Sequence, residues 1–211
     1  MLENVTLIAQ NAIRIVSKDG KIIYFDPFKI EDRFSNDADY IFITHSHFDH
    51  FSPEDIKKIK KDNTLLIAPM DLQNDIERLK IEHYLIVSPN EINEVNGLVF
   101  STIPAYNTNK NFHKKEYNWV GYVVTIDDKK IYVAGDTDDI EEARNVKCDI
   151  AFVPVGGTYT MNAKEAADLI SAMRPQELAI PTHYQTVVES KKDAIEFKEL
   201  LKDVVDVEIL M

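Results

Sequence analysis

Three histidines and one aspartate lie close together in one short stretch of the sequence, directly after the apolar run Tyr40 to Ile43. The run predicts a buried strand, so the stretch would begin where that strand ends. Imidazole nitrogen and carboxylate oxygen are the usual ligands of zinc and similar divalent ions. The sequence therefore predicts a metal-binding loop made by four side chains: His45, His47, Asp49 and His50.

The spacing within this cluster favours two ions rather than one. His45 and His47 are two residues apart, so in an extended segment their side chains emerge on the same side and can bind one ion. Asp49 and His50 are adjacent and share a direction only if the chain turns, which suits them to a second ion beside the first. A two-metal hydrolytic site needs roughly four to six protein ligands. The cluster supplies four.

Two more side chains of the same kinds follow later apolar strands. Asp136 comes after the strand predicted at 130–134, and His183 comes after the strand predicted at 177–180. If these strands lie side by side with the first, Asp136 would bridge the two ions and His183 would complete the second. Alone, Asp136 is typical of a turn and His183 of a partly buried structural histidine. Their partnership with the cluster favours the role of ligand.

The elements that must position these residues alternate between strand and helix. The two halves each begin with strands and continue with this alternation, which is typical of an α/β protein with two packed sheets and helices outside. Ser52 and Pro53 indicate a helix start, and Asp19-Gly20 indicates a hairpin. Strands are predicted at 12–16, 21–25, 40–43, 64–68, 84–87, 98–103, 119–126, 130–134, 150–155, 177–180 and 204–210, and helices at 52–61, 71–80, 162–173 and 193–201.

Length and composition exclude several classes of protein. A chain of 211 residues suits a single domain, or two small halves that share a core. It has no apolar run long enough to cross a bilayer, and Met1 to Asn4 does not resemble a secretory signal, so we expect a cytoplasmic protein with no membrane partner. The net charge of −12 disfavours nucleic acid as a partner. We expect the single cysteine, Cys148, to be a small core side chain.

In order and spacing, these motifs resemble those of the metallo-β-lactamase superfamily. The features are His45-x-His47-x-Asp49-His50, Gly135-Asp136-Thr137 and the late His183. More narrowly, the chain looks like the ascorbate-6-phosphate lactonase-like branch of small metal-dependent hydrolases. That likeness rests on three further motifs: Asp26-Pro27-Phe28, Gly156 to Met161, and Ile180 to Tyr184.

The resemblance covers nearly the whole chain and implies both a fold and a cofactor. The fold would be a four-layer αββα sandwich of two mixed β-sheets flanked by helices, in the α/β (α+β) class, as one domain over residues 1–211. The metals would lie at one edge of the paired sheets. We expect two zinc ions per chain, with Mn²⁺ or Fe²⁺ as alternatives because nitrogen and oxygen ligands serve all three.

The chain departs from the family pattern at one ligand position. Many members of the superfamily carry a metal-binding histidine just after the strand that here ends at Pro104, and this chain has Asn107 in the expected place. His113 lies six residues later in the same loop. Either His113 folds back to complete the first ion's ligands, or Asn107 or water takes that place.

The implied reaction is metal-assisted hydrolysis of a small-molecule substrate, with an ester, lactone or similar carbonyl bond as the target. Asp49 would orient the attacking water and take up its proton, and Tyr184 or Tyr106 would stabilise an oxyanion. Asp26 is either an acid that orients a ligand histidine or a turn residue before Pro27. The alternatives are a phosphodiesterase acting on a small phosphodiester, and a non-catalytic metal-binding protein that keeps the fold. The oligomeric state stays open, a homo-oligomer included.

Overall fold

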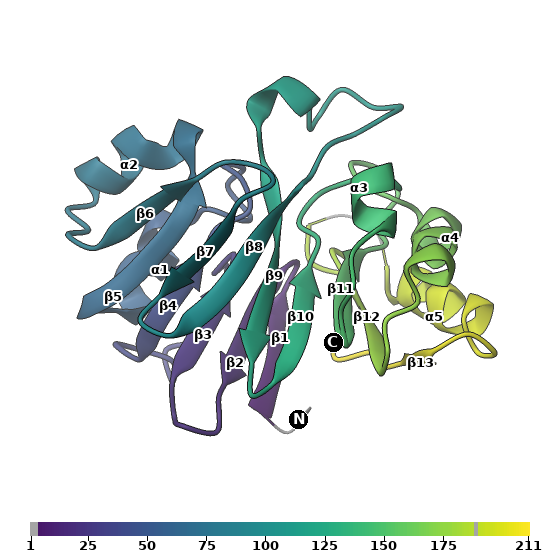
Figure 1. Ribbon diagram of the computed structural model, residues 1–211, viewed down its shortest axis with the longest axis horizontal. Coiled ribbons are helices and arrows are strands. Elements are labelled where there is room, and N and C mark those ends of the chain that lie inside the picture. The colour runs from purple at the N-terminus through teal and green to yellow at the C-terminus, as the bar shows by residue number, and fades with distance from the viewer. Residues whose placement is uncertain (1–3, 188–189) are drawn as a thin grey trace. The chain divides into compact units, whose positions relative to one another are not determined.

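The chain divides into two compact units, Met1–Ser88 and Pro89–Met211. The structure is a computed structural model that describes residues 4–187 and 190–211. Each unit is built on one β-sheet (Figure 1). The expectation that the chain lacks a signal peptide rests in part on residues 1–3, which lie outside the described residues, and the single-domain assignment stays a prediction. Within the described ranges, no helix has the length and apolar character needed to span a bilayer.

The first unit contains a six-stranded mixed sheet whose strands follow their order in the chain. The first three strands pair antiparallel, and β3 to β6 pair parallel. Parallel neighbours end at the same edge of a sheet, so the residues that follow β3 and β4 come together there. The strands are β1 (Val5–Ala9), β2 (Ala12–Val16), β3 (Ile22–Phe25), β4 (Ala38–Phe42), β5 (Lys60–Pro69) and β6 (Tyr84–Val87).

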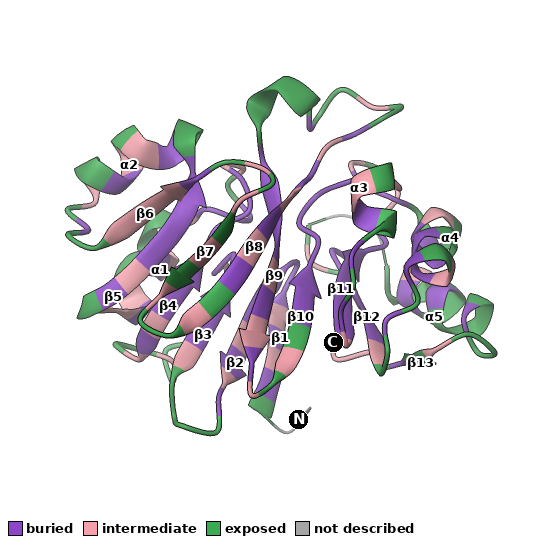
Figure 2. Cartoon of the chain, viewed as in Figure 1, coloured by how far each residue is buried: buried purple, intermediate pink, exposed green. Residues whose placement is uncertain are grey.

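Two α-helices, α1 (Pro53–Ile59) and α2 (Gln73–Arg78), share a hydrophobic core with this sheet, and a short 3₁₀ turn, η2 (Met70–Leu72), precedes α2. Helix α1 begins as the sequence predicts, because the Ser52 side chain accepts a hydrogen bond from the Asp55 backbone N–H. The central strands are largely buried, whereas the helices keep an exposed side (Figure 2). The core joins Ile56 and Ile59 of α1 and Ile76 of α2 to Ile41 and Leu66 of the sheet.

The second unit contains a seven-stranded mixed sheet, again in chain order. Strands β7 to β10 pair antiparallel, and β10 to β13 pair parallel. The strands are β7 (Ile92–Val95), β8 (Leu98–Pro104), β9 (Val120–Ile126), β10 (Lys129–Val133), β11 (Ile150–Pro154), β12 (Leu178–Thr182) and β13 (Asp206–Val207). The helical elements are η3 (Lys115–Tyr117), α3 (Glu141–Arg144), α4 (Ala163–Met173) and α5 (Lys191–Leu200).

The predicted class is confirmed, because both sheets are mixed and carry helices, but several elements differ from the prediction. The strand expected at 204–210 is reduced to Asp206–Val207, because within 204–210 the ladder with β12 includes only these two residues. The helix expected at 71–80 is broken into η2 and α2. Strand β7 was not predicted because Ile92 is an exposed apolar residue on the edge of the sheet. A tight turn at Asn96 and Gly97, both with positive φ, joins β7 to β8.

Candidate metal centre

The loop after β4 turns sharply at the histidine cluster. The backbone N–H groups of His50 and Phe51 both donate to the His47 carbonyl oxygen, at 3.0 and 2.8 Å. The turn allows the side chains of the adjacent residues Asp49 and His50 to point in the same direction, as the sequence analysis expects for a shared ion. The Asp49 Oδ2 atom lies 3.7 Å from His50 Nε2.

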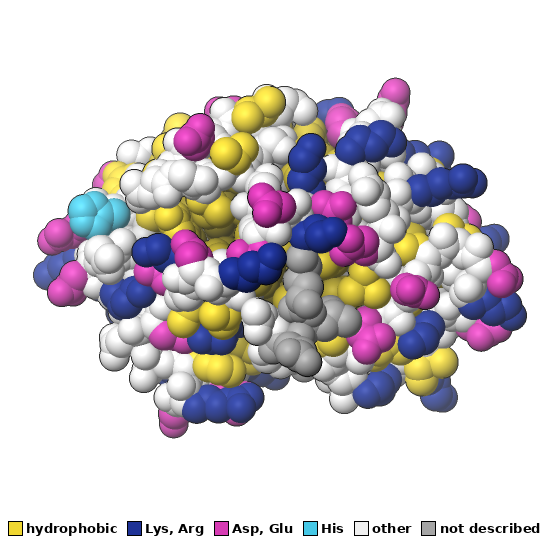
Figure 3. Space-filling view, turned by 60° about the horizontal axis from the view of Figure 1, so that its bottom comes forward, with side chains coloured by type: hydrophobic (Ala, Val, Ile, Leu, Met, Phe, Trp, Pro, Cys, Tyr) yellow, Lys and Arg dark blue, Asp and Glu magenta, His cyan; other side chains and the backbone are white. Residues whose placement is uncertain are grey.

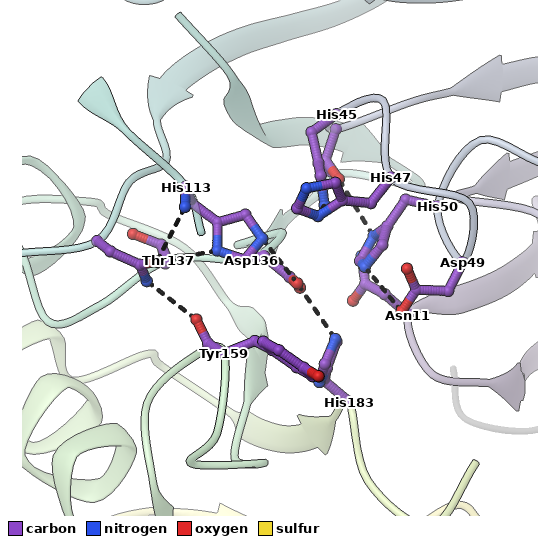
Figure 4. A network of polar contacts seen from close by, with 12 residues as sticks. Asn11, His45, His47, Asp49, His50, His113, Asp136, Thr137, Tyr159 and His183 are labelled. Carbon is purple, nitrogen blue, oxygen red and sulfur yellow. Dashed lines mark hydrogen bonds and ion pairs between the residues drawn. The ribbon is translucent and has the colours of Figure 1, made fainter. Parts of the chain in front are cut away.

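His45 and His47 face each other within this loop (Figure 4). His45 Nε2 lies 3.0 Å from His47 Nδ1, a separation from which two nitrogens can bind the same ion. The other ring nitrogen of His45, Nδ1, lies 3.0 Å from the Thr44 hydroxyl. Because that hydroxyl donates to the Asp26 carboxylate, it accepts from His45 Nδ1–H and leaves Nε2 of His45 as the ligand atom.

Asp26, at the end of β3, is a fully buried carboxylate that holds the cluster in place. Its Oδ2 atom lies 2.7 Å from His50 Nδ1 and accepts from the Thr44 hydroxyl, and its Oδ1 accepts from the Thr44 backbone N–H. A carboxylate on the outer nitrogen of a ligand histidine is the arrangement that metal sites commonly use. Of the two interpretations of Asp26, the structure favours the orienting acid, and its φ of 44° also makes it a turn residue.

Two residues of this network, Gln10 and Asn11, were not identified from the sequence. They form the turn between β1 and β2, and they are 0% and 1% exposed although a hairpin turn is normally on the surface. The Asn11 side chain donates to Asp26 Oδ2 at 2.7 Å, and the Gln10 side chain donates to Asp49 Oδ2 at 3.2 Å. In the sequence, Gln10 and Asn11 are recognisable as two adjacent residues with amide side chains between two apolar strands.

In the second unit, three predicted ligands come together around one oxygen atom. The Oδ2 atom of Asp136 lies 3.2 Å from His113 Nε2 and 3.1 Å from His183 Nε2 (Figure 4). All three side chains are at least nine-tenths buried. Asp136 follows β10, and His183 follows β12 with a positive φ of 57°, an uncommon conformation that is often found at functional sites. A carboxylate between two histidines is well placed to bridge two ions.

His113, and not Asn107, presents a ring nitrogen to Asp136. The Asn107 side-chain oxygen accepts from the His113 backbone N–H at 3.0 Å and lies 3.1 Å from His113 Nδ1. Asn107 therefore contacts the outer nitrogen of His113, so that the inner nitrogen faces the carboxylate. Among the alternatives open from the sequence, this geometry favours His113.

Neither tyrosine considered for an oxyanion role has a contact that supports it. The Tyr184 hydroxyl is fully buried and accepts from the Met211 backbone N–H at 3.2 Å, and burial raises the pKa of Tyr184. The Tyr106 hydroxyl donates to Glu142 and accepts from Lys115. Both hydroxyls thus have structural partners in the second unit.

Cys148 behaves as the sequence predicts. Its side chain is buried, and its sulfur lies 3.7 Å from the sulfur of Met173. Burial, reinforced by the charge of Asp149, raises the pKa of the Cys148 thiol to about 12. A thiol that stays protonated is a poor nucleophile and a poor metal ligand, so Cys148 takes no part in the candidate centre.

The candidate ligands of both units suit a divalent ion. They provide only imidazole nitrogen and carboxylate oxygen, which are suitable for zinc, manganese and iron. Three candidate ligands have a hydrogen-bond partner at the outer ring nitrogen: Thr44 for His45, Asp26 for His50 and Asn107 for His113. On the face drawn in Figure 3, acidic and basic side chains are mixed, and its described residues form no basic stripe.

The chain is similar to known metal-dependent hydrolases. Residues 4–183 match the model of the beta-lactamase superfamily domain. A UPF0173 metal-dependent hydrolase from Pyrococcus horikoshii is 33% identical over 184 residues, which cover 82% of this chain and 79% of the relative. One from Thermococcus onnurineus is 32% identical over 183 residues, with the same coverage.

Solved structures give the same result for the fold. A crystal structure from Parabacteroides distasonis, provisionally described as a metal-dependent hydrolase, has a TM-score of 0.84 and 30% identity, and the match covers 97% of this chain and 91% of that one. A metallo hydrolase from the archaeon Ignicoccus hospitalis has a TM-score of 0.79 at 23% identity and covers 97% and 93%.

Proposed function

Since the chain belongs to the metallo-β-lactamase superfamily, among its UPF0173 metal-dependent hydrolases, we propose that it hydrolyses a small-molecule ester, lactone or similar carbonyl bond at a binuclear metal centre. The observation that carries the proposal is the position of Asp136 Oδ2 between the Nε2 atoms of His113 and His183. An isolated structural ion pair needs only one histidine. A carboxylate with a histidine on each side has the ligand arrangement of a bridge between two ions.

Each unit supplies proposed ligands. His45, His47, Asp49 and His50 of the first unit and His113, Asp136 and His183 of the second would hold the ions. The family match runs through residues 4–183 and so includes every proposed ligand. We propose zinc as the metal and two ions per chain, with Mn²⁺ or Fe²⁺ as the alternatives.

When bound, ions of this kind polarise a substrate oxygen and lower the pKa of a coordinated water from its bulk value toward about 7. The protein's own groups then orient the reactants. Asp49 is the proposed base: its Oδ2 accepts from Gln10, which fixes the carboxylate, while its other oxygen can take up the proton of the attacking water. Asp26 and Thr44 hold the histidines so that the site does not reorganise during the reaction.

Exposed aromatic side chains beside the ligands support a substrate with an apolar part. Phe48, between His47 and Asp49, is 66% exposed and contacts the ring of Phe28 edge-on at 5.9 Å. In the second unit, Phe112 precedes His113, is 46% exposed, and meets Tyr159 in the same way. Such rings favour an apolar acyl or alkyl group over a highly charged phosphate.

The first test is metal analysis of the purified, reloaded protein together with turnover of a substrate panel. We expect two divalent ions per chain and hydrolysis of lactones and aryl esters in preference to bis-nitrophenyl phosphate. Faster cleavage of the phosphodiester would instead support the phosphodiesterase alternative. Fewer than one tightly bound ion per chain after reloading would refute the metal centre, and a single ion without any turnover would support a non-catalytic protein.

The narrower likeness to the ascorbate-6-phosphate lactonase-like branch stays a prediction, as do the cytoplasmic location and the absence of nucleic-acid and membrane partners. The substrate panel tests the first of these. Activity toward a phosphorylated sugar lactone above that toward simple lactones would support that branch.

A further inference from the structure

Tyr159 is a partly exposed residue in the connection between β11 and α4. Gly157, with a φ of 80°, lies at the turn of this connection, and its backbone N–H donates to the Met161 carbonyl oxygen at 2.9 Å. Among residues 4–187 and 190–211, the Tyr159 hydroxyl has no hydrogen-bond partner. A hydroxyl of this kind, on a residue that solvent reaches, is available to a ligand.

One amide side chain connects Tyr159 to the loop that carries His113. The nitrogen of the Asn107 side chain donates to the Tyr159 carbonyl oxygen at 3.0 Å, and its oxygen accepts from the His113 backbone N–H at 3.0 Å. The same nitrogen donates to Asp138 Oδ1 at 3.1 Å, while Asp138 Oδ2 accepts from the Thr108 backbone N–H at 2.8 Å. These hydrogen bonds hold the backbone of Tyr159 beside a candidate ligand.

The ring of Tyr159 is directed toward the candidate ligands of the second unit. It contacts the ring of Phe112, the residue before His113, edge to face, with the two ring centroids 4.7 Å apart. In Figure 4, the side chain extends from the Tyr159 carbonyl toward His183, whose Nε2 lies 3.1 Å from Asp136 Oδ2. The hydroxyl at the far end of the ring is therefore on the side of the ligands.

Four other tyrosines of the second unit are poorly placed to contact a substrate. Three of them are fully buried, out of reach of a substrate: Tyr122, Tyr132 and Tyr184. Tyr106 donates its only hydroxyl proton to Glu142 at 3.0 Å, so it has none left for a substrate oxygen. Tyr159 combines a partly exposed ring, an available hydroxyl proton and two contacts with the ligand loop.

We propose that Tyr159 is a catalytic residue whose hydroxyl donates a hydrogen bond to the carbonyl oxygen of the substrate. When the water oxygen bonds to the carbonyl carbon, the π electrons of the C=O bond move onto that oxygen, and the hydrogen bond strengthens as the charge develops. The tetrahedral intermediate collapses when the bond to the leaving oxygen breaks, and this oxygen takes the proton that Asp49 removed from the water. Tyr159 keeps its own proton throughout. The assignment rests on the proposed function.

The test is Tyr159→Phe, assayed on the lactone or aryl ester that the wild-type protein hydrolyses fastest. The variant keeps the ring that contacts Phe112 and loses only the hydroxyl. We expect kcat to fall by about 10²-fold and KM to change by less than about threefold, because the hydrogen bond is stronger in the transition state than in the bound substrate. The matched control is Tyr117→Phe, at an exposed tyrosine whose ring packs against Trp119, which should leave kcat unchanged.

Further measurements separate this role from support of the loop. Metal content and melting temperature should stay unchanged in Tyr159→Phe, since the hydroxyl has no partner within the described part of the chain. A phosphonate monoester, whose charged tetrahedral group resembles the transition state, should bind about 10²-fold more weakly to this variant than to the wild type. In the wild-type protein, the phosphonate should also shift the ¹³C NMR signal of a tyrosine Cζ, a measurement that decides the question if Tyr159→Phe does not fold.

A kcat for Tyr159→Phe within about threefold of the wild-type value would overturn the assignment and leave the hydrolase function intact. A fall in kcat with an equal loss of bound metal would also overturn it, because Tyr159 would then only support the metal centre. The same holds for a tyrosine spectrum that the phosphonate does not change. A wild-type protein that hydrolyses no carbonyl compound would refute the proposed function and, with it, the role of Tyr159.

Discussion

The two units provide candidate ligands in opposite ways. The first carries four of them within one short loop after β4, where the order of residues alone brings them close. The second takes three from separate places in the chain, His113, Asp136 and His183, which only the sheet brings together. Ligands that are close together in the chain can be recognised from the sequence. Ligands from separate strands come together only if the order of strands in the sheet places them side by side.

The units nevertheless use similar support. In the first, Asp26 contacts the outer nitrogen of His50, and in the second Asn107 contacts the outer nitrogen of His113. A charged acceptor strengthens the basicity of its histidine more than a neutral amide does. The comparison therefore predicts that removing the Asp26 charge in the first unit weakens metal binding more than removing the Asn107 amide in the second.

The largest effect is expected for Asp136, because it is the shared neighbour of two histidines. Asp136→Asn keeps the size of the side chain and removes the charge proposed to bridge the ions. We expect kcat/KM to fall by more than about 10³-fold, or about 4 kcal/mol of transition-state stabilisation. Asp128→Asn, an exposed aspartate of the same unit, is the control. Activity within tenfold of wild type would exclude a bridging role.

Substitution of one histidine in each unit tests whether both contribute to one centre. We expect His47→Ala and His183→Ala each to lower the metal content by about one ion per chain, with loss of turnover in both, since catalysis by a pair of ions needs both. Metal content is measured by mass spectrometry of the purified proteins. His83→Ala, at an exposed histidine, should keep full occupancy. An active His183→Ala enzyme would mean that the first unit is sufficient.

Loss of the Asp26 charge tests the support in the first unit. Asp26→Asn retains the shape but weakens the contacts to His50 and Thr44, so we expect about 10- to 100-fold weaker metal binding in a chelator competition. The loss should exceed that for Asn107→Leu. A larger loss of metal affinity in Asn107→Leu than in Asp26→Asn would contradict the prediction that the first unit has the stronger support.

A smaller effect is expected for Gln10, which contacts Asp49 through one hydrogen bond. Gln10→Leu removes a hydrogen bond to a charged group, a net contribution of about 1.5 to 3 kcal/mol. We expect kcat to fall by roughly tenfold with little change in metal content, because Asp49 keeps its place as a ligand and loses its orientation. An equal loss of bound metal would show that Gln10 only holds the loop.

No effect on activity is expected from thiol chemistry. The pKa of Cys148 is raised to about 12 by burial, so the thiol stays protonated at neutral pH and should not react with a thiol reagent in the native protein. It should react fully after denaturation, which serves as the control. Rapid labelling of the native protein with loss of activity would place an accessible, reactive group in the second unit.

The sequence predicted the sheets and the ligand types because these depend on local patterns. Apolar runs and turn residues located most strands, and ligand chemistry identified the cluster, Asp136 and His183. It could not decide between His113 and Asn107, because the course of the loop depends on Asp138, which is distant in the sequence. The sequence does not reveal the role of Gln10 for the same reason, since this residue is buried by its contact with Asp49 of a distant loop. Long-range polar contacts have no periodicity by which a sequence reveals them.

Among residues 4–187 and 190–211, each strand pairs only with strands next to it in the chain, from β1 to β6 and again from β7 to β13. A growing polypeptide could thus add every new strand to the edge of the one before, without inserting it between two that have already paired. The first sheet is complete at Val87, before the second begins at Ile92. On the ribosome, the histidine loop can therefore fold while Asp136 and His183 are still to be translated.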